Sequence, residues 1–177
     1  MSGRVINAMC DMTLGEELDL ELLHQHLTGS KYHRGRPQML VVTMKNGRNL
    51  QLFRSGKIQI LGNVSHLDAH SMCYEVLQKI KTFYPNLNLR PLILRNLVVS
   101  VQLNNLIALH KIRSSSHDLF YESELFPAVL IRKWYPIHIS LFHNGNCILT
   151  GLTDIEQVSP IVEQLVTFLS NYHLLYQ

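Results

Sequence analysis

The sequence predicts an α+β protein built from two copies of one unit, each an antiparallel sheet with helices on one face. The first observation is a repeat. Sliding the 177-residue chain along itself by 89 positions pairs like residues over its whole length, among them Asn7 with Asn96, Phe53 with Phe142 and Gly62 with Gly151. The other two are short apolar-polar alternations separated by turn residues, and an amphipathic segment that ends each copy. The repeat predicts one compact domain with a first copy over residues 1–88 and a second over 89–177.

The residue pattern of each copy predicts an extended stretch, a short helix and three strands of a meander, in that order. In the first copy these span Val5 to Leu14, Asp19 to Leu27, Met39 to Lys45, Asn49 to Phe53 and Lys57 to Leu61. In the second copy they span Leu94 to Leu103, Asn105 to Ile112, Ala128 to Lys133, Ile137 to Phe142 and Asn146 to Leu149. Pairs that tolerate positive φ predict hairpin turns at Asn46-Gly47, Ser55-Gly56 and Asn144-Gly145.

A long helix closes each copy. The first is predicted to open at Ser65, with Asp68 three residues later, and the second at a capping box of Thr153 and Glu156. Apolar residues then recur at helical spacing, namely Cys73, Val76, Leu77, Ile80 and Phe83 in the first helix and Val162, Leu165, Val166, Leu169 and Tyr172 in the second. Each long helix is therefore expected to bury one face.

Helices on one side of a sheet leave the other face open. Because side chains alternate along a strand, Ile58 and Ile60 are expected to face the helices. The open face then carries Asn49, Gln51, Phe53, Gln59 and Leu61 in the first copy and His138, Ser140, Phe142, Ile148 and Thr150 in the second. Aromatic side chains there indicate a ligand or partner surface. The alternative is a register slipped by one residue, which would make Phe53 and Phe142 core residues.

Composition excludes several classes of protein. No apolar run approaches the roughly 20 residues of a membrane span, and the first residues lack a signal-peptide pattern. The three cysteines are far apart, which favours a reducing compartment over a disulfide framework. The formal net charge is only +3, but from Leu22 to Leu67 there are seven Lys and Arg residues and no Asp or Glu. This basic zone indicates either a surface that binds a polyanion or a merely solvated edge.

The run from Tyr121 to Gly151 resembles the second repeat of the TATA-box-binding protein core, and Asn7 to Leu20 with Leu52 to Gly62 resembles the first. The resemblance covers nearly the whole chain. It implies a TBP-like saddle, in which two pseudo-symmetric repeats form one curved antiparallel sheet of ten strands with four helices on the convex face. It also implies a nuclear transcription initiation factor, or a viral relative at a viral transcription site. The concave face of such a protein binds the minor groove of A·T-rich double-stranded DNA and kinks it.

The resemblance assigns DNA-binding roles in three groups. The wedges are Phe53, Phe126 and Phe142, with Pro37 at the fourth position. The hydrogen-bonding residues are Asn7 and Asn96, close to the pseudo-two-fold axis, and Thr150. The phosphate-binding residues are Arg36, Lys57 and Arg132. Departures from the family pattern occur at Asp11, Thr43, Gln51, Gln59, Leu61, Val64, Ser140, Asn146 and Thr153. They predict weakened or altered TATA recognition.

Partner surfaces carry over in the same way. Glu122, Glu124 and Leu125 match the family's contact for the general factor TFIIB. Lys31 stands where the family presents an acidic residue to TFIIA, which puts TFIIA binding in doubt. A second function class therefore stays open: an interaction module or competitor that binds general transcription factors without competent DNA binding.

Other chemistry is not expected. His66, His70 and Cys73 share a helix face but lack a fourth ligand, and Cys73 fits the buried stripe, so no metal is predicted. The run from Ser114 to Asp118 contains the residue types of a catalytic triad, but adjacent loop residues rarely adopt that geometry. The sequence therefore predicts neither an enzyme nor a cofactor.

Overall fold

The computed structural model describes residues 3–112 and 118–176, apart from the side chain of His66. Within these residues, ten strands form one antiparallel sheet in the order β2-β3-β4-β5-β1-β6-β10-β9-β8-β7. The chain divides into two compact units. The N-terminal unit comprises residues 8–95, and the C-terminal unit comprises residues 96–177 together with residues 1–7. No helix among the described residues is long and apolar enough to cross a membrane.

The N-terminal unit begins within its first strand, whose first four residues belong to the other unit. Its elements are β1 (Arg4–Thr13), α1 (Leu20–His26), β2 (Ser30–His33), β3 (Met39–Thr43), β4 (Asn49–Phe53), β5 (Lys57–Gly62) and α2 (His66–Ile80). Asp19 caps α1, because its carboxylate accepts from the backbone N–H groups of Glu21 and Leu22, each at 3.0 Å. Ser65 caps α2 as predicted, accepting from the N–H of Asp68 at 3.1 Å.

The C-terminal unit has the same order of strands and a long closing helix. Its elements are β6 (Ile93–Gln102), the 3₁₀ turn η1 (Leu109–Lys111), β7 (Leu119–Phe120), β8 (Ala128–Trp134), β9 (Ile137–Phe142), β10 (Asn146–Leu152), the 3₁₀ turn η2 (Ile155–Gln157) and α3 (Val158–Asn171). As with β1, the first residues of β6 lie in the other unit.

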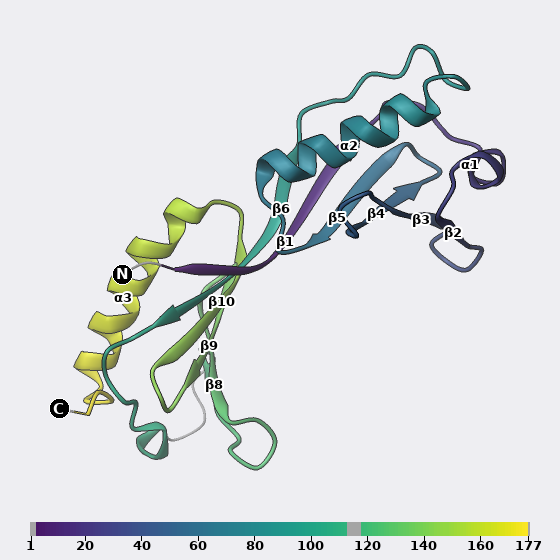
Figure 1. Cartoon of the computed structure of the whole chain (residues 1–177). Helices are drawn as coiled ribbons and strands as arrows, with labels where there is room; N and C mark the ends of the chain where they lie inside the picture. Colours follow the sequence, from purple (N-terminus) through teal and green to yellow (C-terminus); the bar gives the residue numbers. More distant parts are fainter. Residues whose placement is uncertain (1–2, 113–117, 177) are drawn as a thin grey trace. The chain divides into compact units, whose positions relative to one another are not determined.

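The core of each unit lies between its strands and its long helix. In the N-terminal unit α2 lies along one side of the strands, and in the C-terminal unit α3 does the same (Figure 1). Leu50, Leu52, Ile58 and Ile60 are at most 1% exposed, whereas their strand neighbours are half-buried or exposed. The predicted alternation and register are therefore confirmed, and Phe53 lies on the helix-free face. Glycines with positive φ occupy the three predicted hairpin turns, at Gly47, Gly56 and Gly145.

Two local predictions were wrong. The expected helix from Asn105 to Ile112 is only the short turn η1, because Ile107 and Ala108 are held in extended pairing: their N–H groups donate to His143 and Leu174. The closing segment of the C-terminal unit is capped by Asp154 and Gln157, one residue later than the predicted pair. The Gln157 side chain accepts from the N–H groups of Thr153 and Asp154, at 2.8 and 3.0 Å.

The structure also has elements that alternation did not identify. β2 and β7 are short strands at the two ends of the strand order. The described residues contain three α-helices, and a 3₁₀ turn occupies the place of the fourth helix that the resemblance implied. The boundary after residue 88 remains a sequence-based prediction.

Candidate nucleic-acid interface

The strand registers place a row of side chains across the helix-free face of each unit. In the N-terminal unit, cross-strand pairing aligns Lys31, Val41, Gln51, Gln59 and Asp11. In the C-terminal unit it aligns Phe120, Leu130, Ser140, Ile148 and Ser100. Each member of the second row stands 89 positions after its counterpart in the first. The two faces therefore have the same geometry and opposite character, one mostly polar and the other mostly apolar.

The predicted wedges lie at the ends of strands on these faces. Phe142 ends β9, and its ring centroid lies 6.0 Å from that of Phe126, in an edge-on arrangement. Phe126 is 44% exposed, in the segment that enters β8. In the N-terminal unit Phe53 ends β4 opposite Met39, and Pro37 is exposed in the loop before β3. The C-terminal unit thus has two adjacent aromatic rings, whereas the N-terminal unit has one ring and a proline.

The predicted hydrogen-bonding residues all lie in the C-terminal unit. Asn7 is exposed on β1. Asn96 is half-buried on β6, and its side-chain oxygen accepts from the backbone N–H of Gly151 at 2.8 Å. That contact fixes the amide, so its nitrogen is the group that can donate to a ligand. Thr150 on β10 is half-buried, while Leu61, its counterpart in the N-terminal unit, is 47% exposed.

The predicted phosphate-binding residues differ in their surroundings. Arg36 is exposed in the loop between β2 and β3, and Arg132 is exposed on β8. Lys57, at the start of β5, is instead held in an ion pair, since its Nζ lies 2.9 Å from Oδ2 of Asp11. Only the first two therefore present their charge without competition from this carboxylate.

Asp11 is the centre of a polar cluster on the helix-free face of the N-terminal unit. Its side chain is 7% exposed, and Oδ2 accepts from Lys57 and from Nε of Arg95, each at 2.9 Å. Its other oxygen, Oδ1, accepts from Nε2 of Gln59 at 3.1 Å. Burial raises the pKa of Asp11, but the hydrogen bonds from Lys57, Gln59 and Arg95 and the charge of Lys57 outweigh burial, so the pKa lies below its ordinary value.

Sequence reasoning identified Asp11 and Gln59 as departures and missed their connection and Arg95. Arg95 is far from both in the sequence, and only the pairing of β1 with β5 and the path of the chain into β6 bring the three together. A comparison of the two copies could have indicated the pair. The counterparts of Asp11 and Gln59 are Ser100 and Ile148, so at both positions the first copy has a carboxylate or an amide that the second copy lacks.

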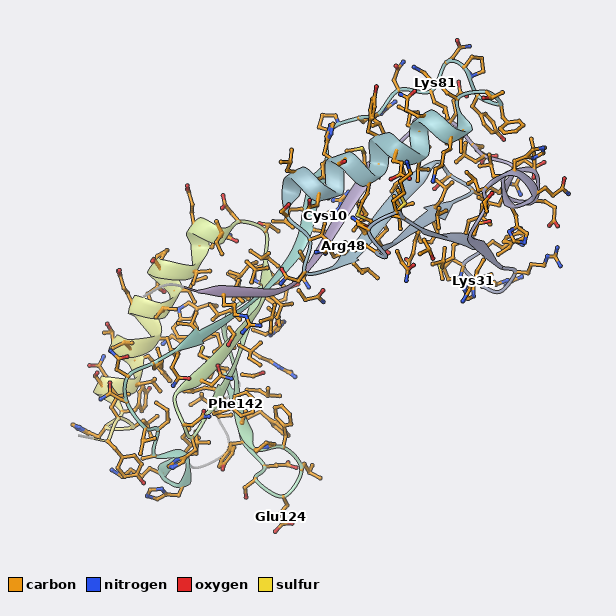
Figure 2. All side chains as sticks on the ribbon, viewed as in Figure 1. Cys10, Lys31, Arg48, Lys81, Glu124 and Phe142 are labelled. Atoms are coloured by element: carbon orange, nitrogen blue, oxygen red, sulfur yellow. The ribbon has the colours of Figure 1, made fainter. Side chains whose placement is uncertain are left out.

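The predicted partner residues occupy an exposed turn between β7 and β8. The N–H groups of Leu125 and Phe126 both donate to the carbonyl of Glu122, each at 3.0 Å, which closes the turn. Leu125 is 76% exposed, and Figure 2 shows Glu124 at the tip of the loop, away from the strands. The turn thus presents two carboxylates and an apolar side chain to solvent, and it ends at Phe126, a predicted wedge.

Among the remaining candidate metal ligands, the two that the structure describes do not come together. Cys73 is fully buried in the core of the N-terminal unit, whereas His70 is exposed. The side chain of His66 lies outside the described residues, as does the run from Ser114 to His117. Across residues 3–112 and 118–176, no group of three or more His, Cys, Asp or Glu side chains could hold a metal ion.

Comparisons with known proteins agree on one family. The family model described as transcription factor TFIID, or TATA-binding protein (TBP), matches residues 2–83 and 92–172. A TATA-box-binding protein of Pyrobaculum aerophilum is 26% identical over 178 residues, with 99% of this chain and 89% of that protein covered. One of Haloarcula marismortui is 29% identical over 174 residues, with 96% and 94% covered.

The fold also matches that of a solved structure. The Methanococcus jannaschii TBP structure matches with a TM-score of 0.83, covering 97% of this chain and 99% of that chain at 21% identity. This likeness shows the fold, and it confirms the predicted α+β class with a single antiparallel sheet. The matched family is one of transcription factors and not of enzymes.

Proposed function

Because the chain belongs to the TATA-binding protein family, we propose that it is a transcription initiation factor that binds and bends double-stranded DNA. The helix-free faces of its two units are the binding surface, and they contact the minor groove of A·T-rich DNA. The observation that carries this proposal is the pair of Phe126 and Phe142, whose rings lie 6.0 Å apart at the end of a sheet face with few charges.

The wedges provide the bending step. An apolar side chain inserted between two base pairs unstacks them and kinks the duplex, at a cost of a few kcal/mol. Phe126 and Phe142 offset this cost by burying aromatic surface, while Pro37 has less surface and no aromatic face. The C-terminal unit is therefore the stronger bending half, and Phe53 alone supplies aromatic surface in the N-terminal unit.

The polar groups position the duplex. A·T base pairs present only acceptors to the minor groove, and the amide nitrogens of Asn7 and Asn96 are donors that match them. Arg36 and Arg132 bind phosphates at the edges of the faces. Asp11 competes with phosphate for Lys57. The affinity for a TATA element is therefore lower than it would be if Arg36, Lys57 and Arg132 were all free to bind phosphate.

Partner recruitment uses the exposed turn of the C-terminal unit. Glu122 and Glu124 offer two carboxylates to a basic surface, and Leu125 adds an exposed apolar contact. This chemistry fits a TFIIB-like factor. On β2, Lys31 presents a positive charge where a TFIIA-like partner would need an acidic one, so TFIIA is not a strong partner. The site of action is the compartment of the DNA, the nucleus in a eukaryote.

A second function is favoured by one specific observation, the engagement of Lys57 by Asp11 in the N-terminal unit. With Pro37 and Leu61 on the same unit, it favours a competitor that occupies a TFIIB-like factor without bending DNA. The two functions differ in a single measurable property, which is DNA binding by the chain itself.

The test is fluorescence anisotropy with a labelled A·T-rich duplex at several salt concentrations, with and without a TFIIB-like factor. If Arg36, Lys57 and Arg132 each neutralise one phosphate, log affinity falls with log salt with a slope of about −3, and about −2 if Lys57 stays with Asp11. Binding that is absent at low salt both with and without the factor refutes the proposal. Factor binding without DNA binding supports the competitor.

A further inference from the structure

The amide of Gln59 has a fixed orientation on the helix-free face of the N-terminal unit. Gln59 is half-buried, directly opposite Asp11 on β1 and Gln51 on β4. Its Nε2 donates to Oδ1 of Asp11 at 3.1 Å. An ionised carboxylate only accepts hydrogen bonds, so the nitrogen must face Asp11 and the side-chain oxygen must point the other way. Asp11 therefore determines that Gln59 offers an acceptor.

The same cluster holds Asp11 in place. Its second oxygen accepts from Lys57 and Arg95, each at 2.9 Å, and its side chain is 7% exposed. The two cations keep the carboxylate ionised and on this face. Asp11 is thus a positioning residue, and Gln59 is the side chain that can reach a ligand.

An acceptor at this position can distinguish base pairs in the minor groove. The floor of the minor groove shows only acceptors at A·T pairs, whereas a G·C pair adds one donor, the N2 amino group of guanine. An acceptor oxygen matches that amino group and opposes the acceptors of an A·T pair. At the position of Gln59 the other unit has Ile148, whose aliphatic side chain offers guanine no acceptor. Ser100, the counterpart of Asp11, donates its hydroxyl to Oδ1 of Asn146 at 2.9 Å.

We propose that Gln59, held by Asp11, makes the N-terminal unit select a G·C base pair within the site, while the C-terminal unit selects A·T pairs. This inference rests on the proposed function of minor-groove binding. The preferred site is then asymmetric, with a guanine amino group under one half only, and the protein binds it in one orientation.

The experiment compares guanine with inosine, which lacks only the N2 amino group. A single G·C pair is moved step by step through an otherwise A·T duplex, and each duplex has a twin with I·C at that step. Anisotropy gives the two affinities for the unmodified protein. We expect a G·C duplex to bind about fivefold more tightly than its I·C twin, a single net hydrogen bond, at positions confined to one half of the site.

Variants assign the effect to the two residues. Asp11→Asn lets the Gln59 amide turn over, because the new side chain can donate as well as accept, so the G·C to I·C ratio should fall to about one. Gln59→Ile copies Ile148 of the other unit and should reduce the ratio in the same way. Gln78→Ile makes the same change on the exposed side of α2 and should leave the ratio unaltered. A purely structural role for Asp11 would lower both affinities and keep their ratio.

The outcomes separate the two proposals. If the protein binds the A·T duplex but binds G·C no better than I·C at every position, the inference is wrong and the proposed function stands. If it binds no duplex at any salt concentration, with or without the TFIIB-like factor, both are overturned. The scan of the unmodified protein decides the matter even where a variant fails to fold.

Discussion

Exchanging the wedge residues tests whether the two units bend DNA unequally. Phe126 and Pro37 are counterparts, 89 positions apart. Phe126 is 44% exposed, and a phenylalanine has about 200 Å² of surface, so inserting its ring between bases removes up to about 90 Å² from water. At about 25 cal/mol per Å² this contributes about 2 kcal/mol. Phe126→Ala should therefore weaken DNA binding about 30-fold.

Pro37→Ala should cost much less, because a proline ring is smaller and cannot stack on a base, and Pro37→Phe should increase both affinity and bending. The assay is fluorescence energy transfer across one end-labelled A·T-rich duplex, with anisotropy for affinity. Loss of the contact with Phe142 costs folding stability of about 0.5–1.5 kcal/mol, so thermal unfolding of each variant is the control. Equal effects of Phe126→Ala and Pro37→Ala, or no bending at saturation, would refute the reasoning.

Three further predictions concern partners, acid stability and thiols. Glu122→Arg with Glu124→Arg should abolish capture of a TFIIB-like factor while leaving the melting temperature unchanged, since the turn is exposed; undiminished capture would remove this site. The pKa of Asp11 is lowered, so its stabilisation is fully present above the ordinary value of 3.8 and is lost as the pH falls further, through the lowered pKa. Urea unfolding as a function of pH should show this loss, and Asp11→Asn should remove it. Burial raises the pKa of Cys73 and Cys147 to about 12, so both should resist a thiol reagent at pH 8 until the chain is unfolded; rapid labelling of the folded protein would contradict their burial.

Much of the fold could be predicted from patterns that are local or periodic. Alternation located β3, β4, β5, β8, β9 and β10, since each has one buried face, and Gly47, Gly56 and Gly145 marked three of their turns. The residues around position 109 contain no local signal against the short helix that was expected there. Its residues have the spacing of a helix, and the bonds that Ile107 and Ala108 make to His143 and Leu174 come from distant segments.

The candidate site was also predictable only in part. The resemblance predicted the wedge positions, and the structure places the ring centroids of Phe126 and Phe142 6.0 Å apart. The sequence also indicated that Gln59 and Asp11 depart from the family pattern. It could not show that Asp11 takes Lys57 and Arg95 as partners, because each prediction treated a residue alone and Lys57 was assigned to phosphate.

The sequence by itself determined the repeated unit and the face of each strand that is buried, since both follow from spacing along the chain. The wedges were predicted from its resemblance to the family. Only the tertiary structure decided which charges are free and which way an amide points. A carboxylate on β1 meets a lysine and a glutamine of β5 and an arginine of β6 only after the strands have paired. Electrostatic interactions depend on distances between residues that are far apart in sequence, and folding alone sets those distances.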